Sequence, residues 1–209
     1  MLTIMNILGH RRWQEKKDWI RPMERSTKLA THEATPAVKD IALSSNIRIR
    51  PASLVDLPEI FNIYNHAVLH STATFQEVPE SNTFPLQWFR THEKNKLPIF
   101  IASDQGVVGW ASLSPYHPRS GYRFSAETSV YVREDRQGAG IGKALLRTLI
   151  EEASILGLHK LVALIEKENL TSIKLHTSVG FTEAGVLHEV AYKFDRWLDL
   201  VILEKTITG

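Results

Sequence analysis

Residues 137–143 read Gln137-Gly138-Ala139-Gly140-Ile141-Gly142-Lys143 and join two segments of different character. Residues 129–132 before them alternate in the manner of a strand, and residues 143–156 after them form a strongly helical run. A glycine-rich turn from a strand into a helix leaves free N–H groups in the first helical turn, at the positive end of the helix dipole. Such a turn is typical of an anion site, so the sequence predicts a phosphorylated ligand here.

The spacing of the glycines separates the candidate ligands. A dinucleotide fingerprint needs Gly-x-Gly-x-x-Gly, and a P-loop needs Gly-x-x-x-x-Gly-Lys followed by Ser or Thr. Neither pattern fits, because Ala144 follows Lys143. The pattern that fits is Gln-x-x-Gly-x-Gly, although an ordinary strand-to-helix turn remains an alternative for the glycines alone.

The composition narrows the class of protein. A chain of 209 residues with 43% hydrophobic content can form a sizeable core, and one domain with an appendage suits this length. Its 25 basic and 23 acidic residues give a net charge of +2, so we expect neither nucleic acid nor a membrane surface as partner. Cysteine is absent, which excludes disulfides, thiolate metal sites and a cysteine acyl-enzyme.

Two further features of the composition give expectations about metals and location. The nine histidines show no metal-ligand spacing, so no metal is implied. No apolar run reaches the roughly 18 to 20 residues of a membrane span, and the N-terminus lacks the pattern of a cleavable leader. We therefore expect a cytoplasmic protein.

The chain divides into two parts in the sequence. Residues 1–45 begin with a basic, aromatic segment and drift into Thr, Ala and Pro, so we interpret them as an N-terminal extension, disordered or partly helical. Residues 46–209 are expected to form the domain. Their periodicity predicts the order strand, helix, helix, three strands, helix, strand, helix and two strands. This order gives a mixed α/β (α+β) domain with a mostly antiparallel sheet and helices on both faces.

A second motif lies downstream of the glycine turn and has the form Asn-x-x-Ser-x-x-Leu-His-x-x-x-Gly-Phe, from Asn169 to Phe181. With the glycine turn, it resembles the two coenzyme segments of the GCN5-related N-acetyltransferases (GNAT). Residues 63–68, 126–132 and 193–200 resemble one branch of that family, the phosphinothricin and methionine sulfoximine N-acetyltransferases. The resemblance covers residues 47–205.

The resemblance implies a GNAT fold with a seven-stranded sheet, in which the strand before the glycine turn is splayed from its neighbour. It implies acetyl-coenzyme A (acetyl-CoA) as co-substrate, with its pyrophosphate in the glycine turn and its acetyl and pantetheine amides on the backbone of Val130 and Val132. Asn169 and Ser172 could bind the pantetheine or simply cap a helix. The coenzyme-binding residues expected are Val130, Tyr131, Val132, Gln137, Gly138, Ala139, Gly140, Ile141, Gly142, Lys143, Asn169 and Ser172.

Two residues are candidates for the chemistry. Without cysteine, direct attack of the amine on the thioester is the natural route, and the family carries a glutamate base at the position of Glu127. Many members of the family have a tyrosine at the position of His176 as the acid for the thiolate. His176 is therefore either catalytic or a packed side chain beside the coenzyme.

The acceptor is expected to bind at residues 116–123, which supply aromatic rings and two guanidinium groups just ahead of Glu127. Arginine binds carboxylates in a bidentate manner, which suits an amino acid. His117 and Trp197 could complete the pocket, or Trp197 could belong to the core. The substrate-binding residues expected are Phe75, Arg119, Gly121, Tyr122 and Arg123.

The sequence therefore predicts an N-acetyltransferase that acetylates the α-amino group of a small amino acid or an analogue such as phosphinothricin or methionine sulfoximine, with detoxification as one role. The branch implies a homodimer, with residues 193–197 near the partner. The alternatives are a protein N-terminal acetyltransferase and a non-catalytic coenzyme A-binding regulatory module.

Overall fold

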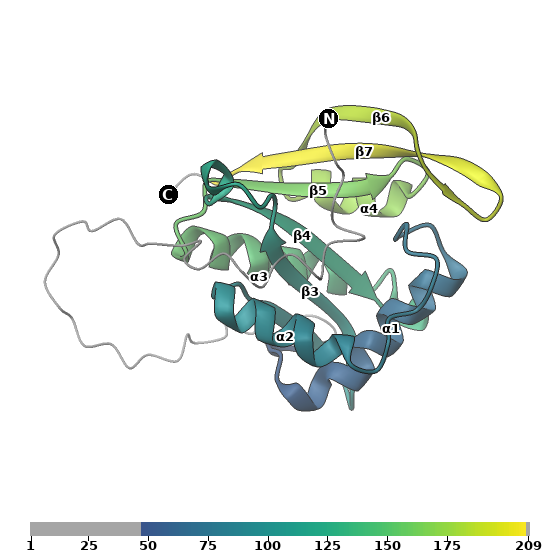
Figure 1. Ribbon diagram of the computed structural model, residues 1–209. Helices are drawn as coiled ribbons and strands as arrows, with labels where there is room; N and C mark the ends of the chain where they lie inside the picture. The colour runs from purple at the N-terminus through teal and green to yellow at the C-terminus, as the bar shows by residue number, and fades with distance from the viewer. Residues whose placement is uncertain (1–46, 208–209) are drawn as a thin grey trace, which may run out of the picture. The chain divides into compact units, whose positions relative to one another are not determined.

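The computed structural model describes residues 47–207, and the predicted N-terminal extension lies outside them (Figure 1). Seven strands and four helices follow one another in the predicted order. Short 3-10 turns precede α1, β4 and α3. The elements are β1 (Arg48–Pro51), α1 (Leu57–His70), α2 (Phe84–Asn95), β2 (Ile99–Ser103), β3 (Val107–Pro115), β4 (Ser125–Val132), α3 (Ile141–Ile155), β5 (Lys160–Glu166), α4 (Leu170–Thr177), β6 (Thr182–Lys193) and β7 (Arg196–Thr206).

The seven strands form one sheet in the order β1-β2-β3-β4-β5-β7-β6. All neighbouring strands are antiparallel except β4 and β5, which are joined through α3 and run parallel. A parallel pair needs a crossover of this kind, whereas antiparallel strands can be joined by short turns. The prediction of a mixed, mostly antiparallel sheet is confirmed.

Helices cover both faces of the sheet, as predicted. One face packs against α1 and α2 around the buried side chains of Ile60, Phe61, Phe89 and Trp110. The other face packs against α3, whose Leu145, Leu146 and Leu149 are fully buried. Figure 1 shows α1 and α2 side by side. Because side chains alternate along β4, its odd-numbered residues face α1 and α2 and its even-numbered residues face α3.

Strands β4 and β5 pair only at their beginnings. Their register contains three pairs and ends with Glu127 opposite Val162, although β4 continues to Val132 and β5 to Glu166. Figure 1 shows the two strands starting together and separating toward their carboxyl ends. The predicted splay is present, and we call the gap between residues 128–132 and 163–166 the fork.

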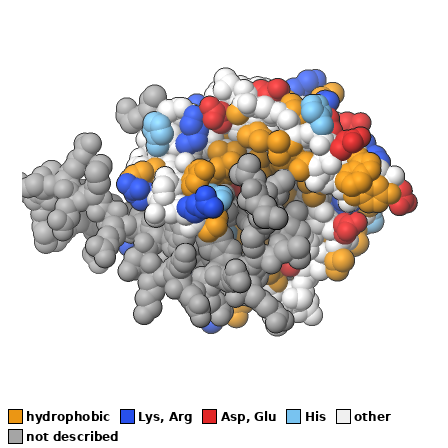
Figure 2. Space-filling model, turned by 45° about the horizontal axis from the view of Figure 1, so that its top comes forward, with side chains coloured by type: hydrophobic (Ala, Val, Ile, Leu, Met, Phe, Trp, Pro, Cys, Tyr) orange, Lys and Arg blue, Asp and Glu red, His pale blue; other side chains and the backbone are white. Residues whose placement is uncertain are grey.

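The last two strands form a long hairpin at the edge of the sheet. Strand β6 carries a register shift between Leu187 and Ala191, within which Glu189 has a positive φ of 51°. The turn between the strands consists of Phe194 and Asp195, with φ of 51° and 57°. Aromatic side chains are exposed around this turn, and Figure 2 shows hydrophobic side chains at this edge of the molecule, with charged groups around them.

Within the described residues, no helix is long and apolar enough to cross a membrane.

Candidate active site

The glycine turn leads from β4 into the first turn of α3. Gly138 and Gly140 have φ of 78° and 79°, a left-handed conformation that other residues adopt only with strain. Gly140 occupies the N-cap position of α3 and has no side chain to cap the helix. The N–H groups at the start of the helix therefore face the turn, which is the arrangement expected for an anion site.

The fork presents main-chain groups of β4 to its interior. Arg133 N–H donates to the Val108 carbonyl at 2.9 Å, and Tyr116 N–H donates to the Ser125 carbonyl at 3.3 Å. These bonds show that odd-numbered residues of β4 exchange hydrogen bonds with β3. The N–H and C=O groups of Val130 and Val132 consequently lie on the side of β5, where the Val132 carbonyl accepts a hydrogen bond from Nε2 of Gln137 at 3.2 Å.

Helix α4 lies beside the glycine turn because Gly142 allows a close approach. A Cβ atom on Gly142 would lie 3.1 Å from Cδ2 of Leu175. Asn169 caps α4, since its Oδ1 accepts a hydrogen bond from the Ser172 N–H at 3.0 Å. The predicted capping role of Asn169 is therefore present, and the cap uses only the oxygen of the amide.

His176 is buried in α4, with 4% of its surface exposed. Its Nδ1 lies 2.9 Å from the carbonyl of Ser172, so Nδ1 carries the proton and donates it. Nε2 is buried without a hydrogen-bond partner among the described residues, and the Phe181 ring meets the imidazole edge-on at 5.1 Å. Burial lowers the pKa of His176, while the bond to Ser172 raises it less. The imidazole is therefore neutral near pH 7.

Glu127 stands where the fork opens, at the last position of β4 that pairs with β5. It is an odd-numbered residue, so its side chain lies on the face covered by α1 and α2, as does that of Tyr131. Burial raises the pKa of Tyr116 and that of Tyr131, and the negative charge of Glu127 raises both further. The charge of Glu127 therefore acts on both phenols from the point where the two strands part.

The predicted acceptor segment, residues 116–123, folds into a compact aromatic loop ahead of β4. The ring of Tyr122 lies 4.7 Å from that of His117 and 5.8 Å from that of Tyr116. Arg123 stacks its guanidinium 4.5 Å from the centre of the Phe124 ring and donates to the Ser120 carbonyl at 3.3 Å. Arg119 and Gly121 are exposed in the same loop.

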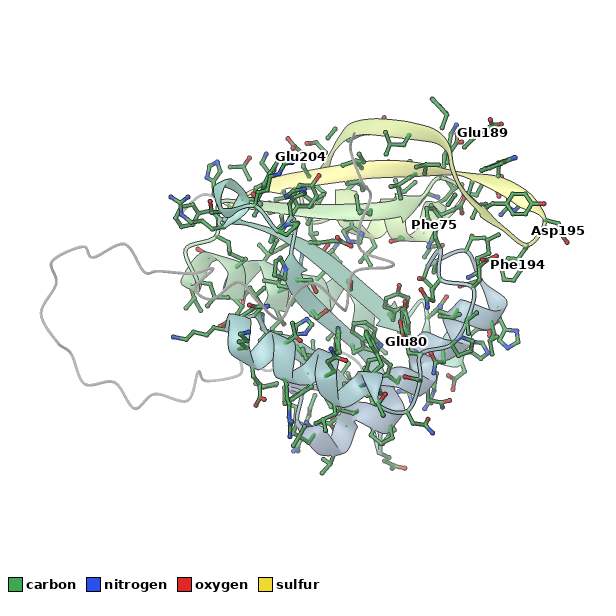
Figure 3. The ribbon with its side chains drawn as sticks, viewed as in Figure 1. Phe75, Glu80, Glu189, Phe194, Asp195 and Glu204 are labelled. Atoms are coloured by element: carbon green, nitrogen blue, oxygen red, sulfur yellow. The ribbon has the colours of Figure 1, made fainter. Side chains whose placement is uncertain are left out.

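Phe75 lies at the other end of β4. It stands two residues after Ala73, whose carbonyl accepts a long hydrogen bond of 3.4 Å from the hydroxyl of Tyr131. Ser125, beside the arginine loop, and Tyr131 are six residues apart, which is about 20 Å along a strand. Phe75 and the two arginines therefore do not lie in one pocket of the same chain. Figure 3 places Phe75 near the β6–β7 turn that carries Phe194.

Several residues around the fork were not predicted to belong to the site. Tyr64, Trp88 and Trp110 form an aromatic cluster with Tyr131, whose ring stacks on that of Trp110 at 4.9 Å. Glu166 and Lys193 are buried charged residues, 5% and 2% exposed. Tyr64 lies within the family-like residues 63–68, but nothing local marks Glu166 or Lys193 as buried. Their partners Thr72 and Ser71 lie 94 and 122 residues away in the chain.

Comparison with known proteins agrees with this geometry. Residues 58–181 match the Acetyltransferase (GNAT) family. An L-methionine sulfoximine/L-methionine sulfone acetyltransferase of Pseudomonas aeruginosa is 44% identical over 158 residues, which is 75% of this chain and 92% of the relative. An L-amino acid N-acyltransferase of Escherichia coli is 39% identical over 157 residues, 75% of this chain and 91% of that protein.

A solved structure shares the fold. The crystal structure of a phosphinothricin acetyltransferase from Sinorhizobium meliloti, in complex with acetyl-CoA, superposes with a TM-score of 0.75 at 34% identity. The match covers 78% of this chain and 89% of that chain. Together with the glycine turn and the fork, these matches show that the chain belongs to the GNAT family of acetyltransferases.

Proposed function

We propose that this protein transfers the acetyl group of acetyl-CoA to the α-amino group of a small amino acid or a close analogue. One observation carries the proposal. The fork ends at the glycine turn on one side and begins at Glu127 on the other, so the candidate phosphate site and the candidate base lie at opposite ends of one strand. A long coenzyme with a pyrophosphate and a distal thioester fits this arrangement.

The residues proposed for the coenzyme follow the course of β4. The pyrophosphate would bind the N–H groups at the start of α3, with Gln137 and Lys143 beside it. The main-chain groups of Val130 and Val132 would receive the amides of the pantetheine arm in the fork. The crystal complex of the Sinorhizobium relative with acetyl-CoA supports this choice of coenzyme.

Acetyl-CoA supplies the acetyl group as a thioester, and Glu127 would take the proton that the amine must lose. The ammonium group of the acceptor would first pass one proton to the Glu127 carboxylate. The neutral nitrogen then forms a bond to the carbonyl carbon, the carbon–sulfur bond breaks, and the second proton passes from the nitrogen to the departing thiolate. A neutral His176 whose Nδ1–H is already donated to Ser172 is better suited to packing beside the coenzyme than to donating a proton from Nε2. The thiolate is a fair leaving group without such an acid, because the pKa of a thiol is only about 8.5.

The acceptor proposal rests on the arginine loop and on the relatives. Arg119 and Arg123 supply guanidinium groups for a carboxylate near the start of β4. The relatives named for methionine sulfoximine and for L-amino acids support a free amino acid or analogue as the substrate class. We further propose that the protein is a cytoplasmic homodimer, with the β6–β7 turn near the partner. Its role would be the detoxification of such analogues.

The proposal is tested by measuring acetyl-CoA consumption with free L-amino acids, methionine sulfoximine, phosphinothricin and a short peptide with a free N-terminus. We expect turnover with a free amino acid or analogue and none with the same compound already acetylated on its α-nitrogen. Turnover with the peptide alone would replace the proposal with a protein N-terminal acetyltransferase. Binding of acetyl-CoA without turnover of any amine would indicate a regulatory module.

A further inference from the structure

Residues 71–77, which follow α1, lie across the open end of the fork, and we call them the 71–77 loop. On the β4 side, the hydroxyl of Tyr131 donates to the carbonyl of Ala73 at 3.4 Å. On the β5 side, the hydroxyl of Thr72 donates to Oε2 of Glu166 at 3.0 Å. The loop is therefore attached to both strands of the fork.

Lys193 attaches the same loop to the end of β6. Its Nζ donates to the carbonyls of Ser71 and Thr74, each at 2.8 Å, and the ammonium is 4.9 Å from the centre of the Phe194 ring. With 2% of its surface exposed, Lys193 is a buried charge. Burial lowers the pKa of the ammonium, and the nearby Glu77 carboxylate raises it less. A buried ammonium needs acceptors, and two carbonyls of this loop supply them.

The 71–77 loop lies on the face from which the acceptor must come. The proposed coenzyme site consists of the main chain of β4 and the start of α3. Helix α3 packs on the face of the sheet opposite α1 and α2. Glu127 and Tyr131 extend toward the face of α1 and α2, and the loop lies over this face at the Tyr131 end of the fork. An amine that gives its proton to Glu127 approaches from this same face.

We propose that Lys193 is a positioning residue for the acceptor, because it holds the 71–77 loop, with Phe75, in place across the fork. Figure 3 shows Phe75 and Phe194 on neighbouring segments at this place. The inference rests on the proposed function, since it concerns the amine that this function requires. Lys193 would act through the loop and would not touch the reacting atoms.

Two variants of the full-length chain test the proposal. Lys193→Met removes the three donors and keeps most of the stem, and Thr72→Val removes the bond to Glu166 at a half-buried position. We expect Lys193→Met to raise the KM for the acceptor about tenfold, as the loss of charge-assisted hydrogen bonds implies. Thr72→Val should raise it less, and the KM for acetyl-CoA should stay unchanged in both. Lys94→Met, at an exposed lysine of α2, is the matched control and should leave both constants unchanged.

Hydrogen exchange of the amides of residues 71–77 is a second measurement, independent of turnover. Exchange should accelerate in Lys193→Met and in Thr72→Val but not in Lys94→Met. If Lys193→Met does not fold, or changes its mass in light scattering, the acceptor KM and the hydrogen exchange of Thr72→Val test whether the 71–77 loop positions the acceptor.

An unchanged acceptor KM, or equal rises in both constants, would overturn the positioning role. If the wild-type protein turns over no amine at all, the proposed function fails. Hydrogen exchange then still decides whether Lys193 fixes the loop.

Discussion

Glu127 combines two properties that a single residue of a regular sheet does not have together. Its backbone is fixed by pairing with Ser114 on one side and Val162 on the other, while the strand beyond it is paired on one side only. A carboxylate at such a position is held rigidly and still borders an opening. Rigid placement matters for a base, because proton transfer requires the two heavy atoms to come within about 3 Å.

Glu127→Gln should keep the binding of acetyl-CoA and lower kcat by about 10² to 10⁴, because the amide cannot accept the proton of the amine. The defect should shrink as the pH rises, since more of the amine is then already neutral. Steady-state rates across pH measure the effect, with calorimetry for the coenzyme. Glu93→Gln, at an exposed carboxylate of α2, is the control. A wild-type pH profile in Glu127→Gln would exclude Glu127 as the base.

His176 makes folding stability depend on pH. Its pKa in the folded chain lies below the ordinary value of 6.5, so between these two values the unfolded chain binds more protons. The free energy of unfolding should therefore fall as the pH drops through this window, by at most about 1.4 kcal/mol per pH unit for one histidine.

In His176→Asn, which keeps a donor near the Ser172 carbonyl, the fall between about pH 7.5 and about pH 5.5 should be smaller. Urea denaturation at the two pH values measures it. His66→Asn, at an exposed histidine of α1, should leave the wild-type dependence intact. An identical pH dependence in all three proteins would contradict a lowered pKa.

At the scale of elements, the sequence predicts the strands, turns and helices that depend on neighbouring residues. The alternation of residues 129–132, the helical run of residues 143–156 and the glycine turn between them each determine a nearby element, and the predicted strand and helix are confirmed as β4 and α3. The insertion of β7 between β5 and β6 and the burial of Lys193 were not predicted. They depend on contacts between residues far apart in the chain, for which the sequence of one segment contains no signal.

The two ends of α3 provide a matched pair of glycines for testing the coenzyme site. Gly140 precedes the helix and Gly157 follows it, and both have a positive φ, of 79° and 69°. Aspartate at either position should cause similar backbone strain of about 1–2 kcal/mol. Only Gly140→Asp places a carboxylate where the pyrophosphate should bind, so only this variant should lose affinity for acetyl-CoA, by at least about tenfold.

Calorimetry with acetyl-CoA, alongside thermal denaturation, separates the two effects. Equal affinities in Gly140→Asp and Gly157→Asp would remove the glycine turn from the coenzyme site.

At the scale of the whole molecule, the hairpin turn exposes more aromatic surface than a monomer needs. Trp197 is 61% exposed and Phe194 is 52% exposed, and the Tyr192 ring lies 5.2 Å from that of Trp197. Interfaces between protein copies are enriched in such residues and usually have two-fold symmetry. This surface supports the proposed homodimer.

Light scattering should give twice the mass of the chain for the wild-type protein. Trp197→Asp should shift the mass toward that of a monomer, because it places a charge in the proposed interface. Ile155→Asp, at a 73% exposed apolar residue at the end of α3, should remain a dimer. A wild-type monomer, or a dimer that tolerates Trp197→Asp, would contradict an interface at the hairpin turn.

The fork also has a consequence for the protein without its coenzyme. It places an unpaired strand edge in the middle of a sheet, and such edges can attract extended segments of other chains and lead to aggregation. A bound pantetheine arm would occupy this edge as an additional strand does. The coenzyme would then be a structural component of the sheet as well as a reactant, and the empty protein would be the form most prone to self-association.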